Sequence, residues 1–325
     1  MSGGVDSSVA AALLKRAGFN VVGIFMNLLG NNSREAAQRA KKVAQTLKIP
    51  FRVLDLQKQF KRKVIECFLK EYRLGATPNP CVICNKEVKF GLLLEKASIL
   101  GADFIATGHY IRRKGQKLLR GKDPAKDQSY FLWKLSKDQV GHILFPVGGH
   151  TKKEVRVMAK KMKLPTADTP GSQEICFVPQ TINEFLRKYF KPKKGKIVNE
   201  TGKVLGEHQG LVFYTIGQRK GIGLAGGPYF VLNKDRKRNT LIVTNDGKTL
   251  LQKTVVFQEQ NWLSGKRPKL GQRLEAKIRS RHQGAAGALK KADTFVFDKP
   301  QRAITPGQSI VFYRRQELLG GGIIR

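Results

Sequence analysis

Acidic residues are scarce in this sequence of 325 residues. The 24 Asp and Glu residues stand against 61 Lys and Arg residues, which gives a formal net charge of +37. This excess of positive charge is spread along the chain and is not confined to one tail. A field of this size attracts polyanions and makes their binding dependent on salt. The composition therefore favours RNA or DNA as a partner over the alternative that the charge serves only solubility.

Cysteine and long apolar runs are also scarce, and each absence excludes a class of protein. Four cysteines in so long a chain do not form a disulfide scaffold, so we interpret them as redox, catalytic or metal-binding groups. No apolar run approaches the ~18 residues that a membrane-spanning helix needs. The N-terminus has no basic region ahead of its short apolar stretch, unlike a secretory signal. We expect a cytoplasmic protein with two or three hydrophobic cores.

The chain begins with a glycine-rich turn that runs directly into a helix. Residues 2–8 read SGGVDSS, an apolar helical stretch follows, and Gly18 is the expected C-terminal cap. Two glycines let the backbone approach an anion closely, and the positive end of a helix favours phosphate. No Gly-Lys-Ser/Thr follows, so the turn lacks the lysine that grips a terminal phosphate in the Walker loop. Asp6 would repel phosphates unless Mg²⁺ bridged them, so we expect Mg²⁺ near Asp6.

Only Met1 precedes this turn, although a phosphate loop of an α/β domain lies between a strand and a helix. We expect that a further strand lies upstream of Met1. The alternative is a degenerate protein with a weakened sheet.

The first half of the chain alternates buried β-branched runs with amphipathic segments. Strands are expected at 20–26, 51–56 and 102–107, and helices at 33–47, 57–72, 85–100 and 153–163. Repeated βα units predict a doubly wound parallel sheet, with ligands at the carboxyl ends of its strands. Cys67 lies beside the apolar stripe of one of these helices, so we interpret it as structural.

The second half changes character after about residue 182, because short β-runs separated by Gly, Asn and Asp replace the helices. Examples of the expected strands are 196–198, 230–232, 240–243, 273–278, 294–297 and 308–313. Their spacing is typical of small barrels or sandwiches. We therefore predict an α/β domain over 1–182, a central β-rich domain over 183–247 and a C-terminal β-barrel domain over 248–325.

Two cysteines lie in a stretch punctuated by prolines, TPNPCVICNK at residues 77–86. We expect a rigid loop that delivers Cys81 and Cys84 to the start of a helix. The helix dipole and Lys86 should then lower the pKa of a thiol there and increase its thiolate fraction.

A third cysteine, Cys176, lies in the loop-like stretch 171–177. The Cys-x-x-Cys pair is a candidate zinc half-site, but a second pair is lacking, and His109 is the only nearby candidate for a fourth ligand. The sequence therefore favours thiol chemistry over zinc.

Several stretches together resemble one family, the tRNA-specific 2-thiouridylases of the MnmA/TrmU type, which are PP-loop ATP pyrophosphatases. They are SGGVDSSVAA, VVGIFM, TPNPCVICNKEVKF, ATGHY, KDQSYFLW, ICF, GEHQGLVFYTIGQRKG, TPGQS and LGGGII. The resemblance covers essentially the full chain. It implies that ATP adenylates the C2 oxygen of the wobble uridine of tRNA, with release of pyrophosphate. Sulfur from a cysteine persulfide then replaces that oxygen, because a persulfide is a strong nucleophile and AMP is a good leaving group.

The resemblance also implies roles for individual residues and partners. Cys84 matches the family nucleophile, and Cys176 matches the cysteine that carries the persulfide. The positions that match the ATP site are Ser2, Gly3, Gly4, Val5, Asp6, Ser7, Met26 and, at the adenine side, Gly108. The positions that match contacts with the target base or tRNA are Asn79, Pro80, Cys81, His109, Lys126, Asp127, Gln128, Arg281, His282 and Gln308. The implied sulfur donor is a cysteine desulfurase or relay protein, and a monomer is expected.

The chain departs from the family pattern at two positions. Many relatives have aspartate where Cys81 stands, and tyrosine is common where His282 stands. Cys81, Cys84 and Cys176 together offer enough thiolates to hold a [4Fe–4S] cluster by three corners. A cluster-dependent sulfurtransferase is therefore the alternative to the persulfide route.

Two further functions stay open. Another PP-loop enzyme, such as a tRNA lysidine synthetase or an amide-forming ligase, would not need the cysteine pair. A catalytically impaired, basic tRNA-binding protein would account for the missing first strand.

Overall fold

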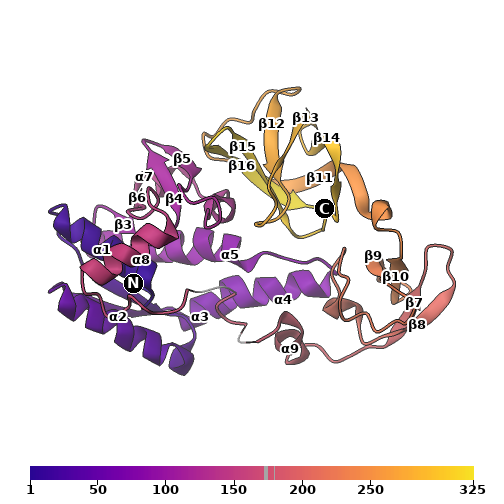
Figure 1. Ribbon diagram of the computed structural model, residues 1–325, viewed down its shortest axis with the longest axis horizontal. Helices are drawn as coiled ribbons and strands as arrows, with labels where there is room; N and C mark the ends of the chain where they lie inside the picture. The colour runs from indigo at the N-terminus through magenta and orange to yellow at the C-terminus, as the bar shows by residue number, and fades with distance from the viewer. Residues whose placement is uncertain (172–174, 179) are drawn as a thin grey trace.

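The computed structural model describes residues 1–171, 175–178 and 180–325. Figure 1 shows an α/β part (indigo to magenta), a C-terminal barrel (orange to yellow) and a smaller β-rich part between them in the chain. Residues 172–174, in the predicted loop before Cys176, and residue 179 lie outside this description. Within the described residues, each helix is too short or too polar to cross a membrane.

The α/β part alternates helices and strands largely as the sequence predicts. Its elements are α1 (Val5–Arg16), β1 (Gly23–Asn27), η1 (Gly30–Ser33), α2 (Arg34–Thr46), β2 (Phe51–Asp55), α3 (Gln57–Phe60), η2 (Lys61–Ile65), α4 (Glu66–Arg73), α5 (Pro80–Ile83), η3 (Cys84–Leu92), α6 (Leu93–Ile99), β3 (Ile105–Ala106), β4 (Ile111–Lys114), β5 (Lys117–Arg120), η4 (Ser129–Leu132), α7 (Lys137–Gly141), β6 (Ile143–Leu144) and α8 (Lys152–Lys161). Gly18 follows α1 with a φ of +84°, which fits the predicted cap.

The parallel strand pairs of this part confirm its α/β class. β1 pairs with β2 in the register Gly23↔Phe51, and β3 pairs with β6 in the register Ile105↔Ile143. In the part of the chain that the structure describes, no backbone ladder joins β1 to β3. The strand expected ahead of the phosphate loop stays a prediction.

Two long helices contain π-helical turns. α3, η2 and α4 follow one another without a break, and so do α5, η3 and α6. The second helix begins at Pro80, earlier than predicted, because proline suits the first helical turn and Asn79 Oδ1 accepts the Cys81 N–H at 3.2 Å. The prediction that the proline-containing loop delivers Cys81 and Cys84 to a helix start is therefore confirmed, although both cysteines lie inside the first turns of the helix and not ahead of it.

The second half is built mainly of strands, as predicted. Its elements are α9 (Ile182–Arg187), β7 (Gly195–Val198), β8 (Val204–His208), η5 (Leu211–Phe213), β9 (Phe230–Asp235), β10 (Thr240–Thr244), η6 (Gly247–Leu250), β11 (Leu251–Trp262), β12 (Arg273–Lys277), β13 (Ala285–Lys291), β14 (Thr294–Arg302), β15 (Ser309–Arg314) and β16 (Glu317–Ile324). β8, β7, β10 and β9 form one sheet in this order. Sequence patterns alone do not predict β8, β11, β13 and β16, whose residues complete the two β-rich parts.

The predicted C-terminal β-barrel is confirmed. β11, β14, β13, β12, β15 and β16 are hydrogen-bonded in this order, and β11 also pairs with β16, which closes the barrel. The β4–β5 hairpin of the α/β part extends this sheet, because Leu118 pairs with Leu318 and Leu119 with Glu317. The barrel is therefore joined to the α/β part by backbone hydrogen bonds.

Hydrophobic cores also cross the predicted domain boundaries. Phe68 of α4 packs against Phe185 of α9, with ring centroids 6.1 Å apart, in a core that continues into the central sheet. Trp133 of the α/β part shares a core with Val311 of β15, and its indole N–H donates to Ser309 Oγ at 3.0 Å. The parts therefore pack as one body, and the boundaries at residues 182 and 247 stay a prediction.

Candidate functional site

The predicted phosphate loop forms the N-terminal end of α1. Gly3 has a φ of +73°, and Gly4 is the N-cap in an extended conformation. Ser7 Oγ accepts the Ser2 N–H at 3.1 Å, while the Ser7 and Ser8 hydroxyls donate to Gly4 O at 3.1 and 2.9 Å. These bonds hold the turn closed, and the N–H groups at the start of the helix have no helical partner. The loop therefore presents donors to an anion, as the sequence predicts.

Two glycines allow neighbouring elements to approach this loop closely. A Cβ on Gly3 would lie 2.3 Å from Ala36 O of α2. A Cβ on Gly108, after β3, would lie 2.6 Å from Asp6 C and from Ser7 N. Gly108 therefore lies beside the phosphate loop, and its place at the adenine side of an ATP site stays a prediction. The Met1 amino group donates to Ile24 O of β1, which brings the loop alongside the strand that carries Met26.

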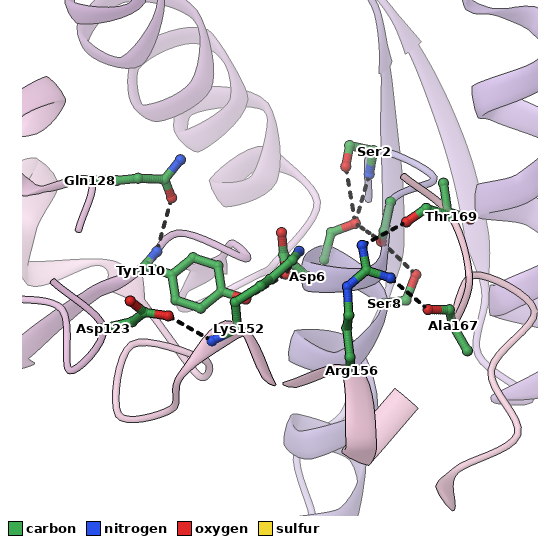
Figure 2. A network of polar contacts seen from close by, with 12 residues as sticks. Ser2, Asp6, Ser8, Tyr110, Asp123, Gln128, Lys152, Arg156, Ala167 and Thr169 are labelled. Atoms are coloured by element: carbon green, nitrogen blue, oxygen red, sulfur yellow. Dashed lines mark hydrogen bonds and ion pairs between the residues drawn. The ribbon is translucent and has the colours of Figure 1, made fainter. Parts of the chain in front are cut away.

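Asp6 is the centre of a polar network beside the loop (Figure 2). Its Oδ1 accepts the Tyr110 hydroxyl at 2.6 Å and the Lys152 ammonium at 2.6 Å. The ammonium also lies 5.8 Å from the centroid of the Tyr110 ring, and the Lys152 N–H donates to Asp123 Oδ2 at 2.9 Å. Burial and the bond to Asp6 raise the pKa of Tyr110, so its hydroxyl stays a donor.

Lys152 reaches Asp6 because α8 packs beside α1. Val155 of α8 and Val9 of α1 are buried in the same core. Thr151 caps α8 in a capping box with Glu154, so the helix begins at Lys152. A cation thus lies beside a phosphate loop that has no lysine of its own.

Arg156, one turn further along α8, links this network to the segment that leads toward Cys176. Its guanidinium donates to Ala167 O at 3.3 Å and to Thr169 O at 3.4 Å (Figure 2). Its charge also lowers the pKa of Tyr110 against the larger effect of burial, so it lies close to the Asp6 network.

The donor set fits the predicted Mg²⁺. Asp6 directs Oδ1 to Tyr110 and Lys152, and among the described residues Oδ2 has no hydrogen-bond partner. Mg²⁺ is usually held by one or two carboxylates together with substrate phosphates and water. Asp6 Oδ2 is therefore the oxygen that would hold it.

The thiols of Cys81, Cys84 and Cys176 lie in one neighbourhood, although Cys176 is far away in the sequence. Burial raises the pKa of Cys84 to about 12, and the nearby thiols of Cys176 and Cys81 contribute in the same direction. Desolvation also raises the pKa of the half-buried Cys81 and of Cys176, whose side chain still reaches the surface. The Lys89 ammonium opposes these shifts at all three thiols. Cys84 and Cys176 therefore lie within electrostatic reach of each other and of the Lys89 ammonium.

The prediction that Lys86 and the helix dipole lower the pKa of a thiol is wrong. Lys86 instead donates to Gln139 Oε1 at 3.2 Å, and desolvation outweighs the favourable charges. The Glu87 carboxylate is paired with another group, since its Oε2 accepts a hydrogen bond from Lys63 Nζ at 2.8 Å. Cys84 and Lys89 are five positions apart in the π-helical turn η3, whose i→i+5 hydrogen bonds align such residues on one side. Lys89 is thus the cation that faces the thiols.

His109 follows Gly108, which packs against the phosphate loop, and lies within electrostatic reach of Lys89. Its Nδ1 is 2.7 Å from Thr107 Oγ1, and its ring centroid is 5.7 Å from that of Phe90. Burial and then the Lys89 charge lower its pKa well below the ordinary value, so the ring is neutral. A direct role in binding RNA would therefore rest on hydrogen bonding and not on charge.

An iron–sulfur cluster held by the three thiols stays a prediction. Among the described residues, no three His, Cys, Asp or Glu side chains are placed to hold a metal ion. All four cysteines are free.

Two residues expected to contact tRNA also form hydrogen bonds within the protein. Asp127 Oδ1 accepts the N–H groups of Gly121 and Ser129 at 3.0 and 3.1 Å. Gln128 Oε1 accepts the Tyr110 N–H at 3.0 Å. Lys126, which precedes them in the chain, is exposed. The side chains of Asp127 and Gln128 hold the turn that positions Tyr110, so Lys126 is the surface group of the three.

The other expected tRNA residues lie on the barrel. Arg281 is exposed between β12 and β13. His282 is half-buried, with its Nε2 2.9 Å from Gln301 Oε1, while Nδ1 accepts the Gly284 N–H at 3.2 Å. Gln308 donates from Nε2 to Thr77 O at 2.7 Å, just before the expected target-base residues Asn79, Pro80 and Cys81.

Comparison with known proteins assigns the chain to a family. Residues 1–180 match the family model described as tRNA methyl transferase HUP domain, residues 183–245 the PRC-barrel domain and residues 252–324 the aminomethyltransferase beta-barrel domain. A protein of Moorella thermoacetica named tRNA-specific 2-thiouridylase MnmA is 46% identical, with 100% of this chain and 98% of that protein covered. The proteins of the same name from Syntrophomonas wolfei and Thermus thermophilus are 43% and 44% identical, again over 100% of this chain, with 98% and 93% of those proteins covered.

The chain belongs to the MnmA family. The resemblance found in its motifs is thereby confirmed over the whole length. The structure also identifies residues of the site that the sequence did not predict, above all Lys152, Tyr110 and Lys89. The capping box after Thr151 could have indicated a cation at a helix start, but nothing in the sequence pattern indicates that α8 meets α1. The π-helical turn that aligns Lys89 with Cys84 has no sequence signature either.

Proposed function

We propose that this chain is an ATP-dependent tRNA sulfurtransferase, which replaces the C2 oxygen of the wobble uridine with sulfur. The names and full-length identities of its relatives support tRNA as the substrate. The adenylation step and the persulfide route are inferred from the phosphate loop and from the thiols.

The observation that carries the proposal is the position of residues 107–109, which follow β3 and lie next to both the phosphate loop and Lys89. Gly108 packs against Asp6 and Ser7 of the phosphate loop. The next residue, His109, lies close enough to Lys89 for that ammonium to lower its pKa, and the same ammonium faces the thiols. ATP chemistry and thiol chemistry are therefore neighbours in one site, which a nucleotide-dependent sulfur transfer requires.

In the first step the uridine C2 oxygen attacks the α-phosphorus of ATP, and pyrophosphate leaves. The N–H groups at the start of α1 bind the phosphates, and Gly108 leaves room for the nucleotide beside them. Mg²⁺ held by Asp6 would neutralise phosphate charge when bound. Lys152 can turn from Asp6 to the phosphates, because the ammonium already lies next to the loop.

In the second step the terminal sulfur of a Cys176 persulfide attacks C2, and AMP leaves with the original oxygen. The Cys84 thiolate then attacks Cys176 Sγ and breaks its bond to the sulfur that is now on C2. That sulfur stays on the tRNA, and a Cys84–Cys176 disulfide forms. A thiol reductant must reopen this disulfide before the next turnover. Because burial holds the pKa of Cys84 at about 12, its thiolate needs the nearby Lys89 ammonium.

The proposal is tested with iron-free protein, tRNA, ATP, Mg²⁺, a persulfide donor and a thiol reductant. We expect 2-thiouridine in the digested tRNA and one AMP released per sulfur incorporated, both measured by mass spectrometry. Cys81→Asp should retain activity within about tenfold, since Cys81 is then only a wall of the base pocket. Lysidine or a new amide product would contradict the proposal.

Iron and labile sulfide in anaerobically purified protein would contradict the persulfide route if both were lost in Cys81→Ser and if activity required them. A cysteine desulfurase or relay protein is the expected source of the persulfide, and the cytoplasm the expected location.

We also expect tRNA affinity to fall steeply as the salt concentration rises, because the protein has a net charge of +37. When Lys and Arg side chains bind phosphates, counterions are released from the tRNA, and added salt opposes this release. Between 50 and 200 mM KCl the affinity should fall by at least about tenfold in a filter-binding titration. The loss should be similar for tRNAs of different sequence, since phosphate contacts carry no sequence information. A flat dependence of log affinity on log salt would contradict this expectation.

A further inference from the structure

The polar groups of Thr77 all bond outside the α/β part to which it belongs. Its N–H donates to Pro306 O at 2.8 Å, and its carbonyl accepts Gln308 Nε2 at 2.7 Å. Its hydroxyl lies 3.1 Å from the hydroxyl of Thr215. Thr77 is therefore attached to the barrel by its backbone and to the central β-rich part by its side chain.

The barrel side of this joint is itself firmly held. The Gly307 N–H donates to Ile324 O at 2.9 Å, and the Ile324 N–H donates to Gln308 O at 2.8 Å. The last strand therefore holds Gly307 and Gln308 in place. Gly307 has a φ of +89°, and a Cβ there would lie 2.8 Å from Ala76 Cβ and 2.9 Å from Thr77 N. The barrel therefore meets the Thr77 backbone in direct contact.

The central side is held in a similar way. The Thr215 N–H donates to Gln218 Oε1 at 3.0 Å, and the Gly217 N–H donates to Val231 O of β9 at 2.8 Å. A Cβ on Gly217 would lie 2.5 Å from Ala303 Cβ, at the edge of the barrel. The central β-rich part and the barrel thus meet each other at the place where both hold Thr77.

Thr77 leads directly into the helix that carries the thiols. Asn79 caps this helix through the Cys81 N–H, and Cys84 follows one turn later. A shift of Thr77 would move the helix start, because only Pro78 separates it from the cap. Reacting groups misplaced by about 1 Å can lose about 10²-fold in rate.

We propose that Gln308 and Thr215 are positioning residues, which hold the Thr77 segment and hence Cys81 and Cys84 in place relative to tRNA docked on the two β-rich parts. The inference rests on the proposed tRNA thiolation. It assigns Gln308 a role within the protein, whereas the family resemblance implies that Gln308 contacts tRNA.

The test uses apolar replacements of similar size, each of which removes one hydrogen bond to Thr77. Gln308→Leu and Thr215→Val should lower kcat for thiolation by about ten- to a hundredfold, while KM for tRNA changes by less than about twofold. Thr215→Ser keeps the hydroxyl and should restore the wild-type kcat. Binding of ATP should stay at the wild-type value in all three variants, and the thermal melting temperature should fall by no more than about 10 °C, the cost of one lost hydrogen bond.

Matched controls are Gln258→Leu on β11 and Thr249→Val, whose side chains are exposed. They should leave kcat unchanged. An increase of KM and Kd for tRNA in Gln308→Leu with unchanged kcat would overturn the inference and establish a tRNA contact. Unchanged kcat in both Gln308→Leu and Thr215→Val would also overturn it. If the wild-type protein forms no 2-thiouridine, the proposed function fails, which is a distinguishable result.

Discussion

Replacing Cys84 or Cys176 with serine should reduce 2-thiouridine formation by more than about 10⁴-fold, since residues that act as one nucleophilic unit are jointly required. A serine hydroxyl at position 176 cannot carry a persulfide, and one at position 84 cannot cleave a sulfur–sulfur bond at neutral pH. ATP affinity should stay within about twofold of the wild type, because the phosphate loop is built from other residues. Mass spectrometry of tRNA nucleosides and a titration with ATP measure the two effects.

The steps are separated by the product that each variant still forms. Cys176→Ser should still adenylate tRNA and release pyrophosphate, because that step uses no thiol. Cys67→Ser is the matched control, since Cys67 is exposed on α4 and should leave thiolation unchanged. Sulfur incorporation at the wild-type rate in Cys176→Ser would contradict the persulfide assignment.

The phosphate loop could be predicted because its signals are contiguous in the sequence. Gly3 adopts a positive φ, Gly4 caps α1, and the serines close the turn. Each of these properties follows from one residue type at one position. The alternation of strands and helices was predictable for the same reason, since periodicity is a local property.

The arrangement of the thiols was only partly predictable. The family motif identifies Cys84 and Cys176, yet their proximity depends on a fold that brings distant segments together. The pKa shift had the wrong sign because desolvation depends on burial, which no local pattern reports. The exposure of Cys67 contradicts its interpretation as a structural core residue, since position beside an apolar stripe does not decide burial.

Long-range pairing was the least predictable feature. Leu118 of the β4–β5 hairpin pairs with Leu318 of the barrel, and the four residues of β5 are too short a run to stand out as a strand. Asp127 illustrates the consequence for a site. The family motif implies a contact with tRNA, whereas the carboxylate is occupied by backbone N–H groups of its own turn. A motif identifies which residues matter but not whether they bind the ligand or shape the protein.

Lys152→Met should lower the rate of tRNA adenylation by about 10²- to 10³-fold, the usual effect of removing one preorganised charge from a reacting anion. The Lys152 ammonium lies 2.6 Å from Asp6 Oδ1, and the side chain is only 16% exposed. The phosphate loop has no lysine of its own, so this cation is the one that α8 supplies to the nucleotide. Pyrophosphate release under saturating tRNA measures the step, and the KM for ATP should rise with the loss of rate.

Lys153→Met is the matched control, because Lys153 is the next residue of α8 and is exposed. It removes the same charge from the protein and should leave adenylation within about twofold of the wild type. Lys152→Arg keeps the charge and should recover part of the rate. If Lys152 served only to neutralise Asp6, then Asp6→Asn would make it dispensable, and the double variant Asp6→Asn/Lys152→Met would be no slower than Asp6→Asn. We expect the double variant to be slower, because the phosphates lose a cation in addition to Mg²⁺.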